Sequence, residues 1–117
     1  MHPFFKGFIF AFQGIKTAFL EQRNLRFHSA AALIVIAAGF IFEITKTEWL
    51  IALLCIAMVI GMELLNTAVE YLTDLASPEI HPLAKKAKDV AAAAVLFVSI
   101  IAAIIGLMIF LPYIQSL

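Results

Sequence analysis

Five polar side chains recur at helical spacing in an otherwise apolar part of the chain. They are Glu63, Asn66, Thr67, Glu70 and Asp74. At about 100° per residue, these positions fall on one arc of roughly 100° around a helix, so they form a single polar stripe. Carboxylates grouped with an amide are oxygen ligands of the kind that Mg²⁺ takes together with substrate phosphates. The stripe is therefore a candidate site for chemistry on a charged substrate.

The stripe continues directly from the uncharged run WLIALLCIAMVIGM, which ends at Met62. If Trp49 marks one interface of a membrane, a rise of about 1.5 Å per residue places Glu63 roughly 21 Å further in, still within hydrocarbon. A carboxylate at that depth is costly and is a functional candidate by default. Simpler interpretations remain open for the other members: an interhelical hydrogen bond for Asn66, and plain hydration at the interface for Glu70 and Asp74.

The composition requires lipid as the solvent. Of the 117 residues, 64% are hydrophobic and 14% are charged, and the mean hydropathy is +1.05. Ordinary soluble domains are roughly 45–50% apolar, and a chain this short could not bury such an excess. The net charge is zero and no basic stripe is interleaved with aromatic residues, so we expect no nucleic-acid partner. The sequence predicts an integral membrane protein.

The apolar runs define an all-α architecture in one domain spanning residues 1–117. An N-terminal amphipathic helix at about 3–20 is expected to lie in the membrane interface with its Phe-rich face in lipid. Three transmembrane helices are predicted at about 27–45, 49–75 and 84–111, since about 20 apolar residues cross a bilayer.

Basic residues are distributed unevenly between the two sides of these spans. Only Lys46 lies on one side, whereas the other side carries Lys6, Lys16, Arg23, Arg26, Lys85, Lys86 and Lys88. The positive-inside rule then puts the N-terminus and the second loop in the cytoplasm. We therefore expect a multi-pass protein of the cell membrane with its polar stripe opening to the cytoplasm.

The lysines that follow the second loop allow two interpretations. Lys85, Lys86 and Lys88 could hold phosphate oxygens or bind anionic lipids at the membrane surface. No GxxxxGK[ST] loop, GxGxxG motif or protein-kinase catalytic loop is present, so any nucleotide site is not of a common type. From spacing alone, a proton-coupled transporter is as plausible as an enzyme.

Two motifs favour an enzyme. The chain reads ELLNTAVE at 63–70, then Asp74, then HPLAKKAKD at 81–89, and together these strongly resemble the prokaryotic diacylglycerol kinase family of small trimeric membrane kinases. The resemblance covers nearly the whole chain, and RNLRFH at 23–28 is similar to the undecaprenol kinase branch. It implies ATP- and Mg²⁺-dependent phosphorylation of a membrane lipid alcohol, undecaprenol before diacylglycerol. A proton-coupled transporter and a structural or regulatory subunit are the weaker alternatives.

The resemblance also implies roles for individual residues. Glu63 would be the general base for the lipid hydroxyl, Asn66 would orient the site, and Glu70 would bind the metal on ATP. The residues implied to contact or border the nucleotide are Glu70, Asp74, Glu79, His81, Lys88 and Asp89.

The chain departs from the family pattern at one position. The family places a glutamate, a second metal ligand, immediately before Arg23, and here that residue is Gln22 with Glu21 one position earlier. An amide is a poorer Mg²⁺ ligand than a carboxylate. Either Glu21 takes the role after a local shift, which we favour, or metal binding rests on Glu70 and the phosphates with weaker affinity, as in an impaired or specialised member of the family. Since one protomer has only three spans, shielding the carboxylates from lipid needs neighbours, and we predict a homo-oligomer, which the resemblance makes a homotrimer.

Overall fold

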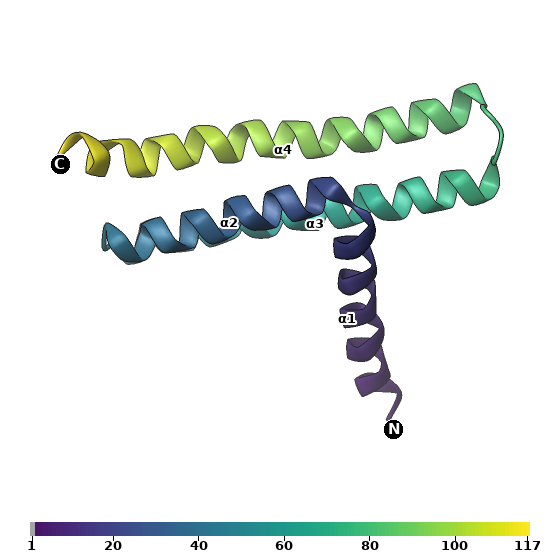
Figure 1. The fold of residues 1–117 in the computed structure, drawn as a ribbon, viewed down its shortest axis with the longest axis horizontal. Helices are drawn as coiled ribbons and strands as arrows, with labels where there is room; N and C mark the ends of the chain where they lie inside the picture. The colour runs from purple at the N-terminus through teal and green to yellow at the C-terminus, as the bar shows by residue number, and fades with distance from the viewer. Residues whose placement is uncertain (1) are drawn as a thin grey trace.

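The computed structural model describes residues 2–117, and these residues are almost entirely helical (Figure 1). Four helices follow one another in the described part of the chain: α1 (Pro3–Glu21), α2 (Arg23–Ile41), α3 (Lys46–Ala76) and α4 (Pro82–Gln115). No strand occurs between residues 2 and 117. The prediction of an all-α chain is confirmed.

The starts of α1, α3 and α4 each have a recognisable local cause. The ring nitrogen Nδ1 of His2 accepts the Phe4 amide at 3.1 Å, and Nδ1 of His81 accepts the Leu83 amide at 3.1 Å. In both helices a proline follows the cap, where its missing N–H costs nothing. Helix α3 begins with a reciprocal capping box between Thr45 and Glu48. These caps fix where the apolar runs begin as helices.

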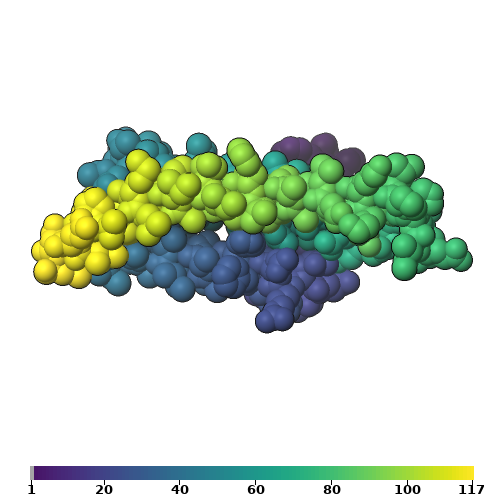
Figure 2. Space-filling view, turned by 90° about the horizontal axis from the view of Figure 1, so that it is seen from above, coloured from purple at the N-terminus to yellow at the C-terminus, as the bar shows by residue number. Residues whose placement is uncertain are grey.

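Helix α3 is the centre of a three-helix arrangement. It packs against α4 over its length and against α2 over the first part, whereas α2 and α4 make little direct contact. Figure 2 shows α4, green to yellow, running along the molecule with α2, blue, beside it. The result is a flat molecule measuring 54 × 42 × 21 Å.

Helix α1 leaves this arrangement at a steep angle (Figure 1). Ala18 is its one buried residue, and its Phe side chains are exposed, for example Phe10 at 65% and Phe12 at 69%. An amphipathic helix oriented across the spans, with aromatic rings uncovered, has the form expected of an interfacial helix.

The outer surfaces of α2, α3 and α4 are apolar. All three helices are long and apolar enough to cross a membrane, and large side chains such as Phe40, Leu75 and Phe97 are at least 70% exposed. Exposed apolar surface on this scale belongs in lipid. The expected membrane protein with three spanning helices is confirmed, while the trimer remains a prediction.

The helices begin and end up to four residues away from the predicted limits of the spans. The first span was expected at 27–45, but α2 covers Arg23–Ile41 and the following turn places Glu43 at φ 51°. The last span was expected to end at 111, but α4 continues through Pro112 to Gln115. A proline removes only one backbone donor and so, close to the helix end, interrupts a single bond of the helix.

Candidate active site

The three buried polar residues of the described chain lie on one face of α3. Glu63, Asn66 and Thr67 are 1%, 7% and 2% exposed. The hydroxyl of Thr67 donates to the carbonyl of Glu63, one helical turn earlier, at 2.9 Å. The Thr67 hydroxyl therefore has its hydrogen-bond partner within its own helix and needs none from elsewhere. Glu63 and Asn66 each keep a buried atom that has no such partner.

Both of these residues keep a buried oxygen without a partner. Oε2 of Glu63 and Oδ1 of Asn66 accept no hydrogen bond from any described residue. The closest basic group to Glu63 is the imidazole of His28 on α2, whose Nε2 lies 3.8 Å from Oε2. Because buried polar atoms are almost always paired, two orphaned oxygens on one helix face indicate a site that a ligand completes.

The stripe continues toward the end of α3 through Glu70. The amide nitrogen of Asn66 donates to Oε1 of Glu70 at 3.4 Å, a long bond that leaves the carboxylate available for another partner. Glu70 is only half-buried, so it lies where the covered part of the stripe opens. The structure therefore places Glu63, Asn66 and Glu70 in sequence from the interior outward.

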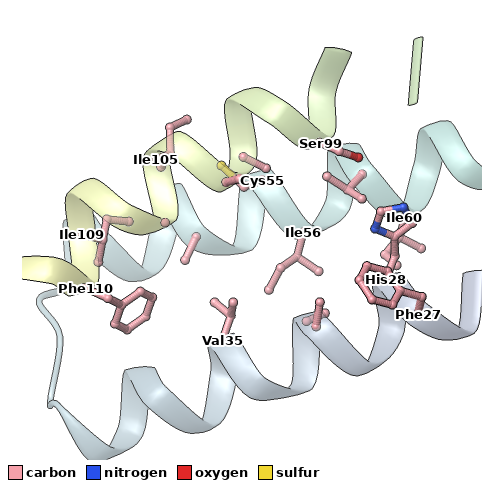
Figure 3. Close-up of a pocket in the computed structure, with 17 residues that line it drawn as sticks. Phe27, His28, Val35, Cys55, Ile56, Ile60, Ser99, Ile105, Ile109 and Phe110 are labelled. Carbon is pink, nitrogen blue, oxygen red and sulfur yellow. The ribbon is translucent and has the colours of Figure 1, made fainter. Parts of the chain in front are cut away.

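A cavity of about 290 Å³ lies next to this face, between α2 and α4 with α3 as its floor. Figure 3 shows His28 and Ser99 near one end and Phe110 near the other. The hydroxyl of Ser99 is a third buried polar atom without a partner among the described residues. His28 thus belongs both to the cavity lining and to the surroundings of Glu63.

The predicted nucleotide residues gather where α3 ends and α4 begins. Nζ of Lys88 lies 2.5 Å from Oδ1 of Asp74, joining the two helices across the loop. Nζ of Lys85 lies 2.6 Å from Oδ2 of Asp89 within α4. All four side chains are at least two-fifths exposed. Exposed ion pairs of this kind contribute little to stability, so each lysine can leave its carboxylate and bind phosphate oxygens at small cost.

The two loop residues predicted to border the nucleotide are exposed. The backbone carbonyl of Glu79 accepts a hydrogen bond from the Ser77 hydroxyl at 2.8 Å within the loop. His81 caps α4 through Nδ1, which accepts the Leu83 amide. The structure gives His81 a structural role that the sequence analysis did not foresee.

The corner between α1 and α2 holds the remaining candidate. Glu21 is the last residue of α1 and is exposed, while Gln22 takes an extended conformation with φ −111° and links the two helices. The guanidinium of Arg26 donates to the carbonyls of Phe19 and Leu20 at 2.8 and 3.0 Å. Arg26 thereby caps α1 and fixes the direction in which the corner points.

The residues present fit a metal that arrives with its substrate better than a resident one. No group of three His, Cys, Asp or Glu side chains able to hold a metal occurs within residues 2–117. The half-buried Glu70 carboxylate and the unpartnered Asn66 Oδ1 are adjacent hard oxygen donors. One or two such carboxylates completed by substrate phosphates are the usual Mg²⁺ arrangement.

Two residues of this region were missed as site residues from the sequence. His28 appears in the sequence as a lone histidine at the edge of an apolar run, and only the packing of α2 on α3 brings it to Glu63. Arg26 looks like one of several interfacial basic residues. The signal that could have found His28 is its ionisable ring within a predicted span, where such groups are rare.

Comparison with known proteins identifies the chain. The family model described as prokaryotic diacylglycerol kinase matches residues 9–110. The chain belongs to the prokaryotic diacylglycerol kinase family. The resemblance carried by ELLNTAVE and HPLAKKAKD is therefore confirmed.

Its relatives within the family include proteins of both branches. The chain is 47% identical over 112 residues to an undecaprenol kinase of Bacillus subtilis, covering 96% of this chain and 91% of the relative. It is 40% identical over 112 residues to a diacylglycerol kinase of Synechocystis, covering 95% of this chain and 64% of the relative. The identity to a diacylglycerol kinase of Escherichia coli is 28% over 95 residues, or 81% of this chain and 78% of the relative.

Proposed function

We propose that the protein is a lipid kinase that transfers the γ-phosphoryl group of ATP to the hydroxyl of a membrane lipid alcohol. Undecaprenol is the favoured acceptor and diacylglycerol the second, in keeping with the names of the relatives. The observation that carries the proposal is Glu63, a carboxylate 1% exposed inside a membrane span whose Oε2 has no hydrogen-bond partner among the described residues.

Glu63 serves as the general base. Its carboxylate accepts the proton of the lipid hydroxyl as the hydroxyl oxygen forms a bond to the γ-phosphorus. The bond between that phosphorus and the bridging oxygen breaks, and ADP leaves with the electron pair. A base placed at the interior end of the stripe meets a hydroxyl that never has to leave the membrane.

Asn66 and Glu70 form the next part of the stripe. Glu70 is the proposed metal ligand, Glu21 at the α1–α2 corner is the second, and Asn66 holds Glu70 in place through its amide nitrogen. When bound, Mg²⁺ neutralises part of the charge on the phosphates. The protein's contribution to phosphoryl transfer is mainly to position these groups.

Lys88 and Asp89 contact the nucleotide, and Asp74, Glu79 and His81 border it. Asp74 is eleven positions beyond Glu63 on the same helix, a distance of roughly 16 Å at about 1.5 Å per residue. That separation leaves room for the phosphates between the base and the lysines. The lipid is thus phosphorylated from the aqueous side of the membrane.

The active assembly is a homotrimer in the cell membrane with its N-terminus in the cytoplasm. The uneven distribution of basic residues supports the orientation. The large exposed faces of α3 and α4 leave room for neighbouring protomers. Crosslinking in membranes that yields only monomers would overturn the trimer and leave the reaction untouched.

The test is a transfer assay in mild detergent. Transfer of the ATP γ-phosphate to undecaprenol and to diacylglycerol is measured in parallel for the wild type, Glu63→Gln and Glu43→Gln. We expect transfer by the wild type and by Glu43→Gln, an exposed residue of the turn, and loss in Glu63→Gln. Faster transfer to diacylglycerol would correct the acceptor, and no transfer to either lipid would refute the function.

A further inference from the structure

The loop between α3 and α4 brings an acid of one helix to a lysine of the other. The two helices lie side by side and are joined by a short loop between Ala76 and Pro82 (Figure 1). Nζ of Lys88, in the second turn of α4, lies 2.5 Å from Oδ1 of Asp74, near the end of α3. Helical side chains lean toward the N-terminus of their own helix, so Lys88 leans toward the loop, where it reaches Asp74.

The neighbouring ion pair has a different geometry. Nζ of Lys85 lies 2.6 Å from Oδ2 of Asp89, four positions later on the same helix. Such pairs form readily on any exposed helix face, and this one leaves its lysine on α4. The Lys85 side chain is 74% exposed, whereas that of Lys88 is 41% exposed. Lys88 is therefore the more strongly held of the two lysines, and it is held from α3.

Asp74 belongs to the polar stripe of α3. It lies one helical turn, about 6 Å, beyond Glu70 on the same face. The ammonium group of Lys88 is thereby kept beside the stripe, next to the carboxylate proposed as the metal ligand. A free lysine side chain loses much of its rotamer freedom when it binds phosphate. A lysine that is already held in place has lost this freedom before the nucleotide arrives.

Asp74 is itself unsuited to contact phosphate. An ionised carboxylate can only accept hydrogen bonds, as phosphate oxygens also do, and the two negative charges repel each other. The ammonium group of Lys88 has three N–H donors, so it can bind a phosphate oxygen while it still contacts Asp74. An exposed ion pair also contributes little to stability. The contact is therefore better explained by the nucleotide than by the fold.

We propose that Asp74 is a positioning residue that holds the ammonium group of Lys88 beside the polar stripe, where it binds the phosphates of the nucleotide. This inference rests on the proposed function and assigns Asp74 its role at the same site. Asp74 acts through Lys88 and makes no contact with phosphate. Removing its charge therefore weakens nucleotide binding, whereas removing an acid that merely lies near the phosphates would strengthen binding.

A double-mutant cycle on nucleotide binding tests this role. The β,γ-imido analogue of ATP is titrated by calorimetry into the protein in mild detergent with Mg²⁺ and without a lipid acceptor. We expect Kd to rise about fivefold in Asp74→Asn, the scale of one exposed ion pair, and about tenfold in Lys88→Met. The double variant should match Lys88→Met, because Asp74 acts only through that lysine. A lower Kd in Asp74→Asn, or multiplied effects in the double variant, would overturn the proposal.

Matched variants separate positioning from a structural role. Asp74→Glu keeps the carboxylate, and its Kd should stay within about twofold of the wild type. Glu43→Gln removes an exposed acid from the turn between α2 and α3 and should bind as the wild type does. In the transfer assay Asp74→Asn should raise KM for ATP and leave kcat unchanged, with the same melting temperature. A loss in Asp74→Glu equal to that in Asp74→Asn, or a fall in melting temperature that accounts for the loss, would refute the positioning role.

The binding measurement also distinguishes this inference from the proposed reaction. If the cycle behaves as expected but no phosphoryl group reaches either lipid, the proposed function is refuted and the role of Asp74 in nucleotide binding stands. If the wild type binds no analogue, both are refuted.

Discussion

The two halves of helix α3 use the same residue type, glutamate, in opposite ways. At the end near the turn, Glu48 accepts the Thr45 amide at 2.9 Å and also accepts the Tyr113 hydroxyl. Fifteen positions further along, Oε2 of Glu63 has no partner among the described residues. The Glu48 carboxylate completes the cap of α3, whereas the Glu63 carboxylate is available to a ligand. Hydrogen bonding rather than residue type separates the structural acid from the functional one.

The packing around these two glutamates also differs. Near the turn, Ile44, Ala52, Ile109 and Phe110 form an apolar cluster. In the same region Trp49 lies so close to Gly39 that an added Cβ would be 2.6 Å from its ring. The cavity runs from His28 and Ser99 to Ile109 and Phe110, so it borders this cluster as well as the surroundings of Glu63. The turn end holds the apolar cluster that stabilises the fold, whereas the stripe holds the buried oxygens of Glu63 and Asn66 that have no partner among the described residues.

The largest effect should come from exchanging the two carboxylates for amides. Glu63→Gln should lower kcat by about 10²–10⁴-fold, since it removes the general base. Its melting temperature should stay the same or rise, because a neutral amide costs less to bury. Glu48→Gln should show the converse, a lower melting temperature with unchanged kcat. Equal loss of activity in both variants would contradict the assignment of Glu48 to structure and Glu63 to catalysis.

Gly39→Ala should produce the largest loss of stability. Its new methyl group meets the Trp49 ring at 2.6 Å, and overpacking of this kind costs roughly 1–3 kcal/mol. Thermal unfolding in detergent measures the change, and Gly61→Ala, whose Cβ has open space, is the control. Equal melting temperatures for the two variants would mean that the turn end is no better packed than the rest.

The ion pair between α3 and α4 should matter for the substrate more than for the fold. Lys88→Met removes a cation that lies 2.5 Å from Asp74. We expect KM for ATP to rise about tenfold, the loss of one charge-assisted contact, with little change in melting temperature because exposed pairs stabilise weakly. Lys86→Met, an exposed neighbour without an ion pair among the described residues, is the control. A shift of melting temperature without a shift of KM would assign Lys88 to structure.

Gln22→Glu should give the smallest effect, and unlike the other variants it should improve the enzyme. A carboxylate beside Glu21 at the α1–α2 corner is a better Mg²⁺ ligand than an amide, so the Mg²⁺ concentration for half-maximal activity should fall. A titration of activity with Mg²⁺ measures it, and Glu21→Gln should move the midpoint the other way. If Glu21→Gln has no effect, Glu21 does not replace the family glutamate.

Much of the fold was predictable because membrane solvation imposes a strong pattern. The apolar runs predicted three spans and the all-α class, since in lipid every backbone group must be paired within a helix. The ends were less predictable. α2 begins at Arg23, four residues before the predicted start of the first span at 27, and α4 passes Pro112. Polar caps and single missing bonds cost little there, so hydropathy alone does not define a terminus.

The sequence by itself determined the stripe. Positions 63, 66, 67, 70 and 74 share a face whatever the helix packs against, because helical periodicity is local. Only the tertiary structure decided which members are buried, that His28 faces Glu63 at 3.8 Å, and that a cavity adjoins them. Those properties depend on the rotation and separation of α2 and α4 about α3, which arise from side-chain packing between segments far apart in the chain.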